Sequence, residues 1–308
     1  MKTINKILNH QLLLSLIILN TVIFILFSPD HFFFELLQSM AFQISIGIIF
    51  LAIIFLVFRK WIGAVVSIIA IVLMWQNISY IKPNFSSKTL GLTNLTVAHY
   101  NVLKHNKNFE NTIESIKNYN ADLVSINEMT YDWNSALRKG LAETYPHQYL
   151  VPQKNSFGIA VFSKKELVNT ETIWFEGIPY ISGEILVNDT SVQFLTAHTI
   201  PPTSKYAYAK RNQEIKHIEN FLSKTDKPKI VIGDFNAVSW SPAMRKLRAN
   251  LDLKDSRKTL QGTFPAWNKF LMIPIDHIFH SSEITCLSFK TISGTDSDHY
   301  GVIGRYRI

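Results

Sequence analysis

The first 80 residues carry almost no charge, and this feature limits most strongly what the chain can fold into. They hold only four of its 31 Lys and Arg and two of its 23 Asp and Glu, and apolar side chains fill nearly all the rest. Such a composition is typical of segments that lie in a lipid bilayer. We therefore expect a membrane anchor over residues 1–80 and a separate domain after it.

Three apolar segments divide the anchor: Leu12–Phe27, Phe32–Phe58 and Trp61–Tyr80. A bilayer needs about 20 apolar residues in a helix, so the first segment (12–27) is rather short, the second is ample, with its span at about 36–58, and the third (61–80) fits. The alternative for the first is a cleaved signal peptide, but it lacks a small-x-small cleavage site and two more apolar segments follow. We expect three transmembrane helices.

The basic residues of the short connections indicate how the anchor is oriented. Lys2 and Lys6 precede the first segment, Arg59 and Lys60 separate the second from the third, and the first connection has no Lys or Arg. Positive residues stay on the cytoplasmic side. We expect a multi-pass protein of the cell membrane whose large domain is extracytoplasmic and follows a short tether over residues 81–94.

The remaining residues, 95–308, have the composition of a globular domain. With the tether they number roughly 230, which suits one large α/β domain with a sizeable core. They carry most of the formal net charge of +8, which is compatible with phosphate-bearing substrates, but no run of Lys and Arg marks a nucleic-acid surface. The single cysteine, Cys286, excludes an internal disulfide and a cysteine-based metal site.

Strand and helix patterns alternate along this domain, as in an α/β fold. Strands are expected at 95–102, 122–128, 156–163, 180–187, 192–198, 275–280, 284–292 and 300–306. Helices are expected at 109–119, 132–145 and 204–223, and from Ser241-Pro242 onward.

The segment Lys229–Asn236, KIVIGDFN, is the most informative stretch of the domain. Its apolar residues follow a Pro-Lys turn and predict a buried central strand, and Gly233 lets the backbone turn sharply where that strand ends. The turn presents Asp234 and Asn236 together. Ligands of alternating α/β proteins bind at strand ends, so these side chains are well placed for chemistry, although Gly, Asp and Asn are also the usual turn residues.

Residues that bind Mg²⁺ or move protons occupy six places at or beside strand ends. They are Asn101, Glu128, His198, Asp234 with Asn236, Asp276 with His277, and Asp298 with His299. Any one of them alone is more often a cap, a turn residue or a solvated loop residue. All six together favour a functional site.

The order of these residues resembles the endonuclease/exonuclease/phosphatase superfamily, the DNase I-like metal-dependent phosphohydrolases. The resemblance covers about Leu95–Ile308 and rests on an Asn-Val strand end, strands that end in Glu and His, and the motifs GDFN, IDHIF and SDH. SFGIAVFS, GDFNAVSWSP and IPIDHIF further resemble a bacterial subgroup in which this domain follows transmembrane helices. The resemblance implies a four-layer α/β sandwich, two packed β-sheets flanked by helices, after the three N-terminal transmembrane helices.

The resemblance also implies a divalent cation, Mg²⁺ or Mn²⁺, held by Glu128 with help from Asn101 and Asp298. Carboxylate and amide oxygens suit a hard cation that keeps several waters. Asp296 competes with Asp298 as a ligand, but an Asp directly before His matches the family pattern. The cation would polarise a phosphoryl oxygen and stabilise the leaving oxygen.

Catalytic roles follow from the same resemblance. Asp234 would orient or deprotonate the attacking water, with Asn236 fixing either the phosphate or Asp234. His299, held in tautomer and charge by Asp276, would face the scissile phosphate, and His198 would donate a hydrogen bond or a proton to it. The histidines interpreted as ordinary residues are His99, His105, His147, His217 and His277.

Two departures from the family pattern bear on the substrate. Val102 and Leu103 follow Asn101, whereas the DNA-repair nucleases of the superfamily resemble a pattern with a carboxylate two positions after that Asn. The loop Thr263–Pro274 is apolar, and although apolar residues are by default core, its Pro and Asn residues are typical of a loop. An apolar loop beside the active site of a tethered domain fits contact with lipid.

Three functions are therefore considered. The leading one is a metal-dependent phosphoesterase that hydrolyses phosphodiester or phosphomonoester bonds, including those of lipid or lipid-linked substrates. The alternative is an extracytoplasmic nuclease of DNA or RNA, and a non-catalytic binding protein ranks third because the set of polar residues is intact. The expected partners are the lipid bilayer and a phosphate-ester substrate (lipid, sugar phosphate or nucleic acid), and no protein partner is predicted.

Overall fold

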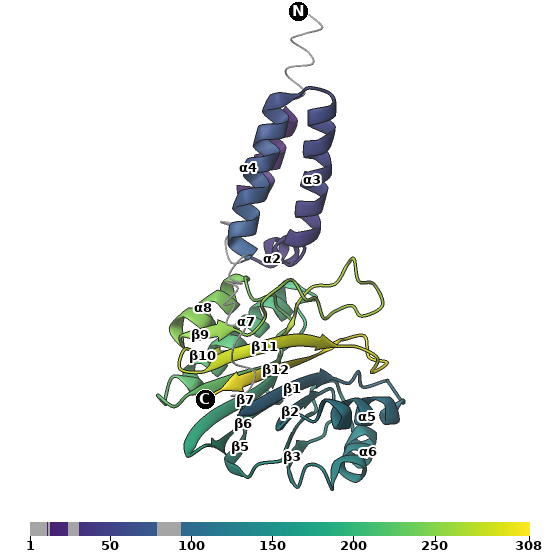
Figure 1. Ribbon diagram of the computed structural model, residues 1–308, viewed down its shortest axis with the longest axis vertical. Coiled ribbons are helices and arrows are strands. Elements are labelled where there is room, and N and C mark those ends of the chain that lie inside the picture. The colour runs from purple at the N-terminus through teal and green to yellow at the C-terminus, as the bar shows by residue number, and fades with distance from the viewer. Residues whose placement is uncertain (1–10, 12, 24–30, 79–93) are drawn as a thin grey trace, which may run out of the picture. The chain divides into compact units, whose positions relative to one another are not determined.

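The computed structural model describes residues 11, 13–23, 31–78 and 94–308. They form two compact units, a helical unit at the N-terminus and an α/β unit after it (Figure 1). The predicted tether, residues 81–94, lies outside the described residues except for Asn94.

The helical unit contains a helix over 13–23 and three labelled helices, α2 (Phe32–Ser39), α3 (Ala41–Val57) and α4 (Trp61–Ile78). α3 and α4 lie side by side in antiparallel orientation (Figure 1). The Ser45 hydroxyl on α3 donates to the Ala41 carbonyl oxygen of its own helix at 2.7 Å and lies 3.9 Å from Met74 Sδ on α4. The Ser45 hydroxyl is thus satisfied inside the pair.

No single helix among the described residues is both long and apolar enough to cross a membrane. α2 and α3 meet that requirement of length and composition only as a pair, and they are bent by 65° at the break between them. The segment predicted as one span at about 36–58 is therefore divided at Met40. Residues 12, 24–27, 79 and 80 of the other two predicted spans lie outside the described residues, and the three transmembrane helices stay a prediction.

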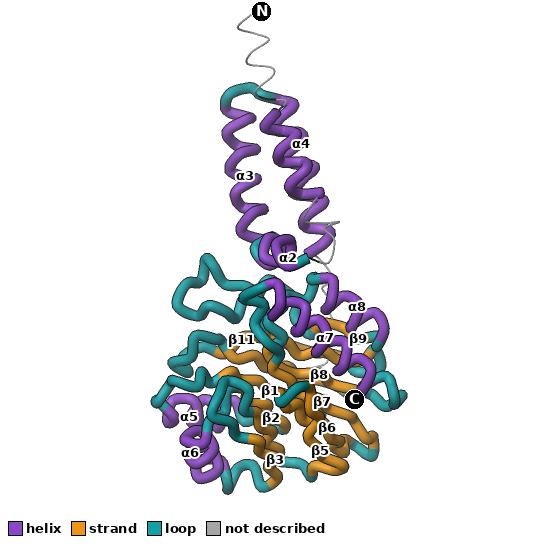
Figure 2. Tube along the Cα trace, turned by 180° about the vertical axis from the view of Figure 1, so that it is seen from behind, coloured by secondary structure: helices purple, strands orange, loops and turns teal. Residues whose placement is uncertain are grey.

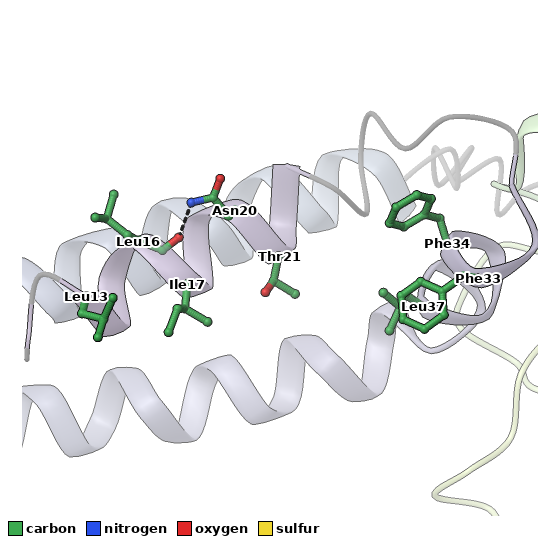
Figure 3. Close-up of a pocket in the computed structure, with 8 residues that line it drawn as sticks. All are labelled: Leu13, Leu16, Ile17, Asn20, Thr21, Phe33, Phe34 and Leu37. Atoms are coloured by element: carbon green, nitrogen blue, oxygen red, sulfur yellow. Dashed lines mark hydrogen bonds between the residues drawn. The ribbon is translucent and has the colours of Figure 1, made fainter.

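An apolar pocket lies within the helical unit, between the 13–23 helix and α2 (Figure 3). The Asn20 side-chain amide donates to the Leu16 carbonyl oxygen at 2.8 Å, so its polar group is used within the helix. No residue of the predicted catalytic or metal site lines this pocket. Its lining residues are Leu13, Leu16, Ile17, Asn20, Thr21, Phe33, Phe34 and Leu37.

Two six-stranded sheets form the centre of the α/β unit (Figure 2). The first sheet has the order β11–β12–β1–β2–β4–β3, with β1 Leu95–Asn101, β2 Leu123–Asn127, β3 His147–Val151, β4 Ile159–Ser163, β11 Thr285–Ile292 and β12 Gly301–Arg307. The second sheet has the order β5–β6–β7–β8–β10–β9, with β5 Leu167–Phe175, β6 Ile178–Val187, β7 Thr190–His198, β8 Lys229–Asp234, β9 Leu253–Asp255 and β10 Asp276–Ser281. Each sheet contains one parallel pair near its middle, β1 with β2 and β7 with β8.

The two sheets pack face to face. Val97 and Leu123 of the first sheet share one buried cluster with Phe194 and Ile232 of the second. These residues come from the period-two alternation of their strands, which directs every other side chain to the same face. The main core of the unit is therefore the layer between the sheets.

Helices cover the two outer faces. The helices are α5 (Phe109–Tyr119) and α6 (Tyr131–Leu141) on the first sheet, and α7 (Lys205–Leu222) and α8 (Pro242–Asn250) on the second. Side chains of Asn108, Thr130 and Ser204 accept backbone N–H groups at the starts of α5, α6 and α7, which explains where these helices begin. The predicted four-layer α/β sandwich is confirmed.

Candidate active site

The parallel pairs of the two sheets end at the same place. In their registers Asn101 of β1 lies opposite Asn127 of β2, and His198 of β7 lies opposite Asp234 of β8. The Asn101 amide donates to Asp234 Oδ2 at 3.2 Å, and the Asp234 backbone N–H donates to Asn127 Oδ1 at 3.1 Å. These two bonds join the sheets where the four strands end.

Gly233 makes the approach of β7 and β8 possible. Its φ is +141°, and a Cβ atom at this position would lie only 1.9 Å from the Ala197 carbonyl oxygen. No other residue fits, because both the backbone conformation and the space exclude a side chain. The sharp turn predicted at Gly233 is not found there: Gly233 lies within β8, paired with Ala197 and His277, and the strand continues to Asp234.

Asp234 is the central carboxylate of the site. Its Oδ1 accepts the Asn236 backbone N–H at 2.9 Å, and its Oδ2 lies 3.6 Å from His198 Nε2 and 3.8 Å from His299 Nε2. Burial, together with the charge of Asp276, raises the pKa of Asp234, while the two histidines act in the opposite direction. A raised pKa makes a carboxylate a better proton acceptor.

His299 and Asp276 form a buried ion pair. His299 Nδ1 donates to Asp276 Oδ2 at 2.9 Å. Burial alone lowers the pKa of His299, but Asp276 and Asp234 outweigh it and raise the pKa to about 10. Burial opposes ionisation of Asp276, yet His299 and His99 hold its pKa well below the usual range. At neutral pH His299 is therefore an imidazolium.

His198 and Asn236 are both held by backbone groups. His198 Nδ1 lies 3.0 Å from the Ser156 carbonyl oxygen, so the proton is on Nδ1 and Nε2 faces Asp234. The Asn236 side chain donates to the Thr199 carbonyl oxygen at 2.8 Å. Of the two roles considered for Asn236, its contacts favour the fixing of Asp234 through its backbone N–H.

Asn101 is the last residue of β1, and Glu128 directly follows β2. Glu128 has a left-handed backbone (φ +63°), and its two carboxylate oxygens accept the Asn101 amide at 3.3 Å and the Lys104 backbone N–H at 2.9 Å. Asn101 Oδ1 accepts the Leu103 backbone N–H. Asn101 thus bridges Glu128 and Asp234 as a donor, and Glu128 is the residue whose oxygens suit a cation.

Asp298 lies beside this group and has an unused buried oxygen. Its Oδ1 has no hydrogen-bond partner among the described residues. Burial raises the pKa of Asp298, His299 opposes this, and the nearby charge of Glu128 raises it further. A divalent cation between the two carboxylates would satisfy the oxygen and offset the repulsion, so these residues fit the predicted metal.

Two other candidates for the metal site, a set of three residues and the single carboxylate of Asp296, fit a cation less well. Asp234, Asp276 and His299 each offer a ligand atom within 4.8 Å of the others. However, His299 is protonated and already donates to Asp276, and an imidazolium has no lone pair for a cation. Asp296, the competitor of Asp298, instead accepts amide hydrogens from Asn108 and Asn111.

His99, which the sequence analysis interprets as an ordinary residue, lies against Asp276 of the predicted site. It is buried, its Nε2 lies 3.2 Å from Asp276 Oδ1, and its Nδ1 lies 3.0 Å from Ser125 Oγ. Ser125 in turn contacts the Thr196 hydroxyl of the second sheet. The available signal was its position two residues before Asn101, which places both side chains on the same face of β1.

Asp276 is also held through its backbone. Its N–H donates to Thr263 Oγ1 at 3.2 Å, and its carbonyl oxygen accepts from the buried guanidinium of Arg257 at 2.6 Å. Arg257 also donates to His277 Nδ1 at 3.0 Å, while His277 Nε2 donates to the Ala237 carbonyl oxygen. Burial and Arg257 lower the pKa of His277 to about 4, so this histidine is a neutral brace for β10.

The sequence matches the model of the endonuclease/exonuclease/phosphatase family over residues 98–299, which includes every residue of the site. The chain belongs to this family. Its members are phosphohydrolases, among them nucleases and phosphatases. No curated protein matches the sequence.

Solved structures of family members share the fold. A mannosyl-6-phosphatase from Bacteroides thetaiotaomicron is 19% identical, with a TM-score of 0.57 over 70% of this chain and 100% of that one. D. rerio TDP2, solved with a single-strand DNA product, is 15% identical, with a TM-score of 0.58 over 70% and 99%. A family member from Bacteroides vulgatus is 18% identical, with a TM-score of 0.58 over 70% and 98%.

Proposed function

We propose that this chain is a divalent-metal-dependent phosphoesterase, anchored to the cell membrane by its N-terminal segments, with its α/β unit on the extracytoplasmic side. Its substrates would be phosphodiesters or phosphomonoesters of lipid, lipid-linked or sugar-phosphate type. The observation that carries the proposal is the meeting of Asp234, His198 and the His299–Asp276 ion pair where two parallel strand pairs end.

The proton acceptor in this arrangement is Asp234. Its Oδ1 is fixed by the Asn236 backbone N–H, and its Oδ2 is bonded to Asn101, so the carboxylate cannot rotate freely. A water beside Oδ2 would be oriented and deprotonated there. Burial strengthens the carboxylate as a base, because it raises the pKa.

Positive charge for the phosphoryl group comes from His299. Its Nδ1 proton is committed to Asp276, which leaves the Nε2 N–H for a phosphate oxygen. His198 presents Nε2 from the other side of Asp234. The His299 N–H is a preorganised donor, and such donors stabilise the negative charge that develops in the transition state.

Glu128 and Asp298 would hold the Mg²⁺ or Mn²⁺ ion, since both offer oxygens and Asp298 Oδ1 is unused. When bound, the ion supplies Lewis-acid stabilisation of a phosphoryl or leaving oxygen. Asn101 would keep Glu128 and Asp234 at a fixed separation through its amide. Asn101 would then be a positioning residue of the metal site.

An experiment with the full chain in non-ionic detergent tests the proposal. Bis(p-nitrophenyl) phosphate, a sugar phosphate, phospholipid in mixed micelles and plasmid DNA would be offered with Mg²⁺, with Mn²⁺ or with a chelator. Metal-dependent turnover that is lost in Asp234→Ala supports the proposal. No turnover of any of these substrates, together with no measurable metal binding, would favour a non-catalytic protein.

The alternative substrate is nucleic acid. It is favoured by the net charge of +8 and by the fold shared with D. rerio TDP2, whose structure contains a single-strand DNA product. A nuclease that binds the phosphate backbone would lose affinity for nucleic acid steeply as the salt concentration increases. Plasmid cleavage with a strong salt dependence and no turnover of phospholipid would select this alternative.

A further inference from the structure

The loop predicted at Thr263–Pro274 is attached to the site at its base. Thr263 Oγ1 accepts the Asp276 N–H, the Ala266 N–H donates to the Asp298 carbonyl oxygen at 2.7 Å, and the Phe264 ring lies 4.8 Å from the His299 ring. Each of these contacts reaches a catalytic or metal-site residue. A ligand held by this loop would therefore lie beside the phosphoester site.

The two limbs of the loop are joined to each other, and its tip is a defined turn. Phe264 and Ile273 exchange backbone hydrogen bonds at 3.1 and 2.7 Å. At the tip the Asn268 side chain accepts the Phe270 and Leu271 N–H groups. Hydrogen bonds within the loop thus hold its two limbs and its tip in place and satisfy part of its backbone polar groups.

The tip turns its large apolar side chains outward. Trp267 is 74% exposed, Phe270 62% and Leu271 37%, and the exposed Lys269 stands among them. Two aromatic rings that are exposed to water on one short loop do not contribute the favourable free energy that their burial would give. Such a surface indicates a partner that covers it.

The chemistry of the tip favours a lipid surface as that partner. Trp and Phe side chains insert at the interface between water and the apolar part of a bilayer, and a neighbouring Lys binds anionic lipid headgroups there. The chain also has many exposed apolar side chains in its helical unit, such as Phe50, Val57 and Phe58, which need an apolar environment. The formal net charge of +8 also favours binding to an anionic lipid surface.

We propose that the tip formed by Trp267, Lys269, Phe270 and Leu271 docks on an anionic bilayer surface and makes phosphoesters of membrane lipids the preferred substrates of the neighbouring site. The choice of substrate rests on the proposed phosphoesterase function. The docking itself does not require that function, so the two ideas fail separately.

Docking is tested on the full chain reconstituted in nanodiscs of phosphatidylcholine, with or without phosphatidylglycerol. Cys286→Ser removes the single thiol, and Phe270→Cys or, as a control, Trp174→Cys on the exposed β5 strand then carries an environment-sensitive fluorophore. We expect doxyl-labelled lipids to quench the fluorophore at 270 more strongly than the one at 174, and more with phosphatidylglycerol present. Equal quenching at the two positions overturns the docking.

Selectivity is tested by the ratio of phospholipid turnover in vesicles to turnover of soluble bis(p-nitrophenyl) phosphate. The double variant Trp267→Ser/Phe270→Ser should lower this ratio by about tenfold or more, because two aromatic anchors are lost. The matched control Trp174→Ser should leave it unchanged. An unchanged ratio in the double variant overturns the selectivity. Quenching at 270 without turnover of any phosphoester keeps the docking and removes the phosphoesterase function.

Discussion

The Nε2 atom of His99 lies 3.2 Å from Oδ1 of Asp276, and neither side chain is exposed to solvent. Asp276 therefore has a histidine on each oxygen, because its Oδ2 accepts from His299. The His99 side chain is in turn fixed by Ser125, which contacts Thr196 of the opposite sheet. The carboxylate that orients the proposed catalytic histidine is thus itself oriented from within the core.

Replacing His99 by Leu should lower kcat while changing KM little. A hydrogen bond to a charged group is worth about 1.5–3 kcal/mol, which corresponds to roughly a 10- to 100-fold loss in rate if Asp276 no longer holds His299 in place. His99→Gln keeps a donor and should recover part of the rate. Steady-state kinetics and the melting temperature check this, and equal kcat values for the Leu and Gln variants would show that His99 serves packing alone.

Replacing Asp234 by Asn should remove most of the activity without unfolding the protein. The amide keeps the shape of the side chain and can accept the Asn236 N–H, but it cannot take a proton from water. A loss of about 10²- to 10⁴-fold in kcat is expected for a general base. Asp296→Asn, a carboxylate outside the site, is the control, and a similar loss in both variants would contradict the role of Asp234.

The cation should bind through Glu128 and Asp298. In calorimetric titrations of Mn²⁺ without substrate, Glu128→Gln and Asp298→Asn should each weaken binding by at least about tenfold. The metal-free Asp298→Asn variant should also be more stable than the parent chain, since a buried charged oxygen without a partner is removed. If Asp276→Asn abolished Mn²⁺ binding and Glu128→Gln did not, the Asp234–Asp276–His299 group would be the metal site.

The strands that the sequence analysis found and those it missed differ in burial. The central strands appear as continuous apolar runs, because both of their faces are covered. β3, β5 and β9 were missed, and all three are edge strands. β3 is half-buried throughout, β5 alternates irregularly, and β9 has only three residues, so none leaves a clear periodic pattern.

The site was predictable in part for the same reason. Asn101, Glu128, His198 and Asp234 end apolar strands, and a polar residue at such a position stands out in a sequence. His99 was missed because it lies inside a strand and its partner Asp276 is 177 residues away. Only the packing of the two sheets brings that pair together, and strand order and register are not visible in local patterns.

Replacing Gly233 by Ala should destabilise the fold severely. A Cβ atom would overlap the Ala197 carbonyl oxygen, which is backbone and cannot move aside, and the φ of +141° is unfavourable for any side chain. A loss of about 3 kcal/mol or more in the free energy of unfolding is expected. Gly177→Ala isolates the steric term, because Gly177 also has a positive φ but no atom near the added Cβ. A similar cost for both variants would contradict the close approach.

Glu214 should make the fold less stable as the pH rises through the weakly acidic range. It is buried on α7, accepts the Ile200 N–H at 2.9 Å, and burial raises its pKa to about 7 from an ordinary value of 4.5. Between these pH values the unfolded chain has released the proton and the folded chain still binds it. Stability therefore falls with pH across that range, by on the order of 3 kcal/mol.

Glu214→Gln keeps an acceptor for the Ile200 N–H and removes the titration. Relative to the parent chain, the variant should be little changed near pH 4.5 and clearly more stable above pH 7, because only the parent then has to bury a charge or bind a proton. Thermal unfolding of both chains in the same detergent and buffers measures the difference, in which all other titrating groups cancel. A difference that is constant between these pH values would show that Glu214 titrates alike in the folded and unfolded chain.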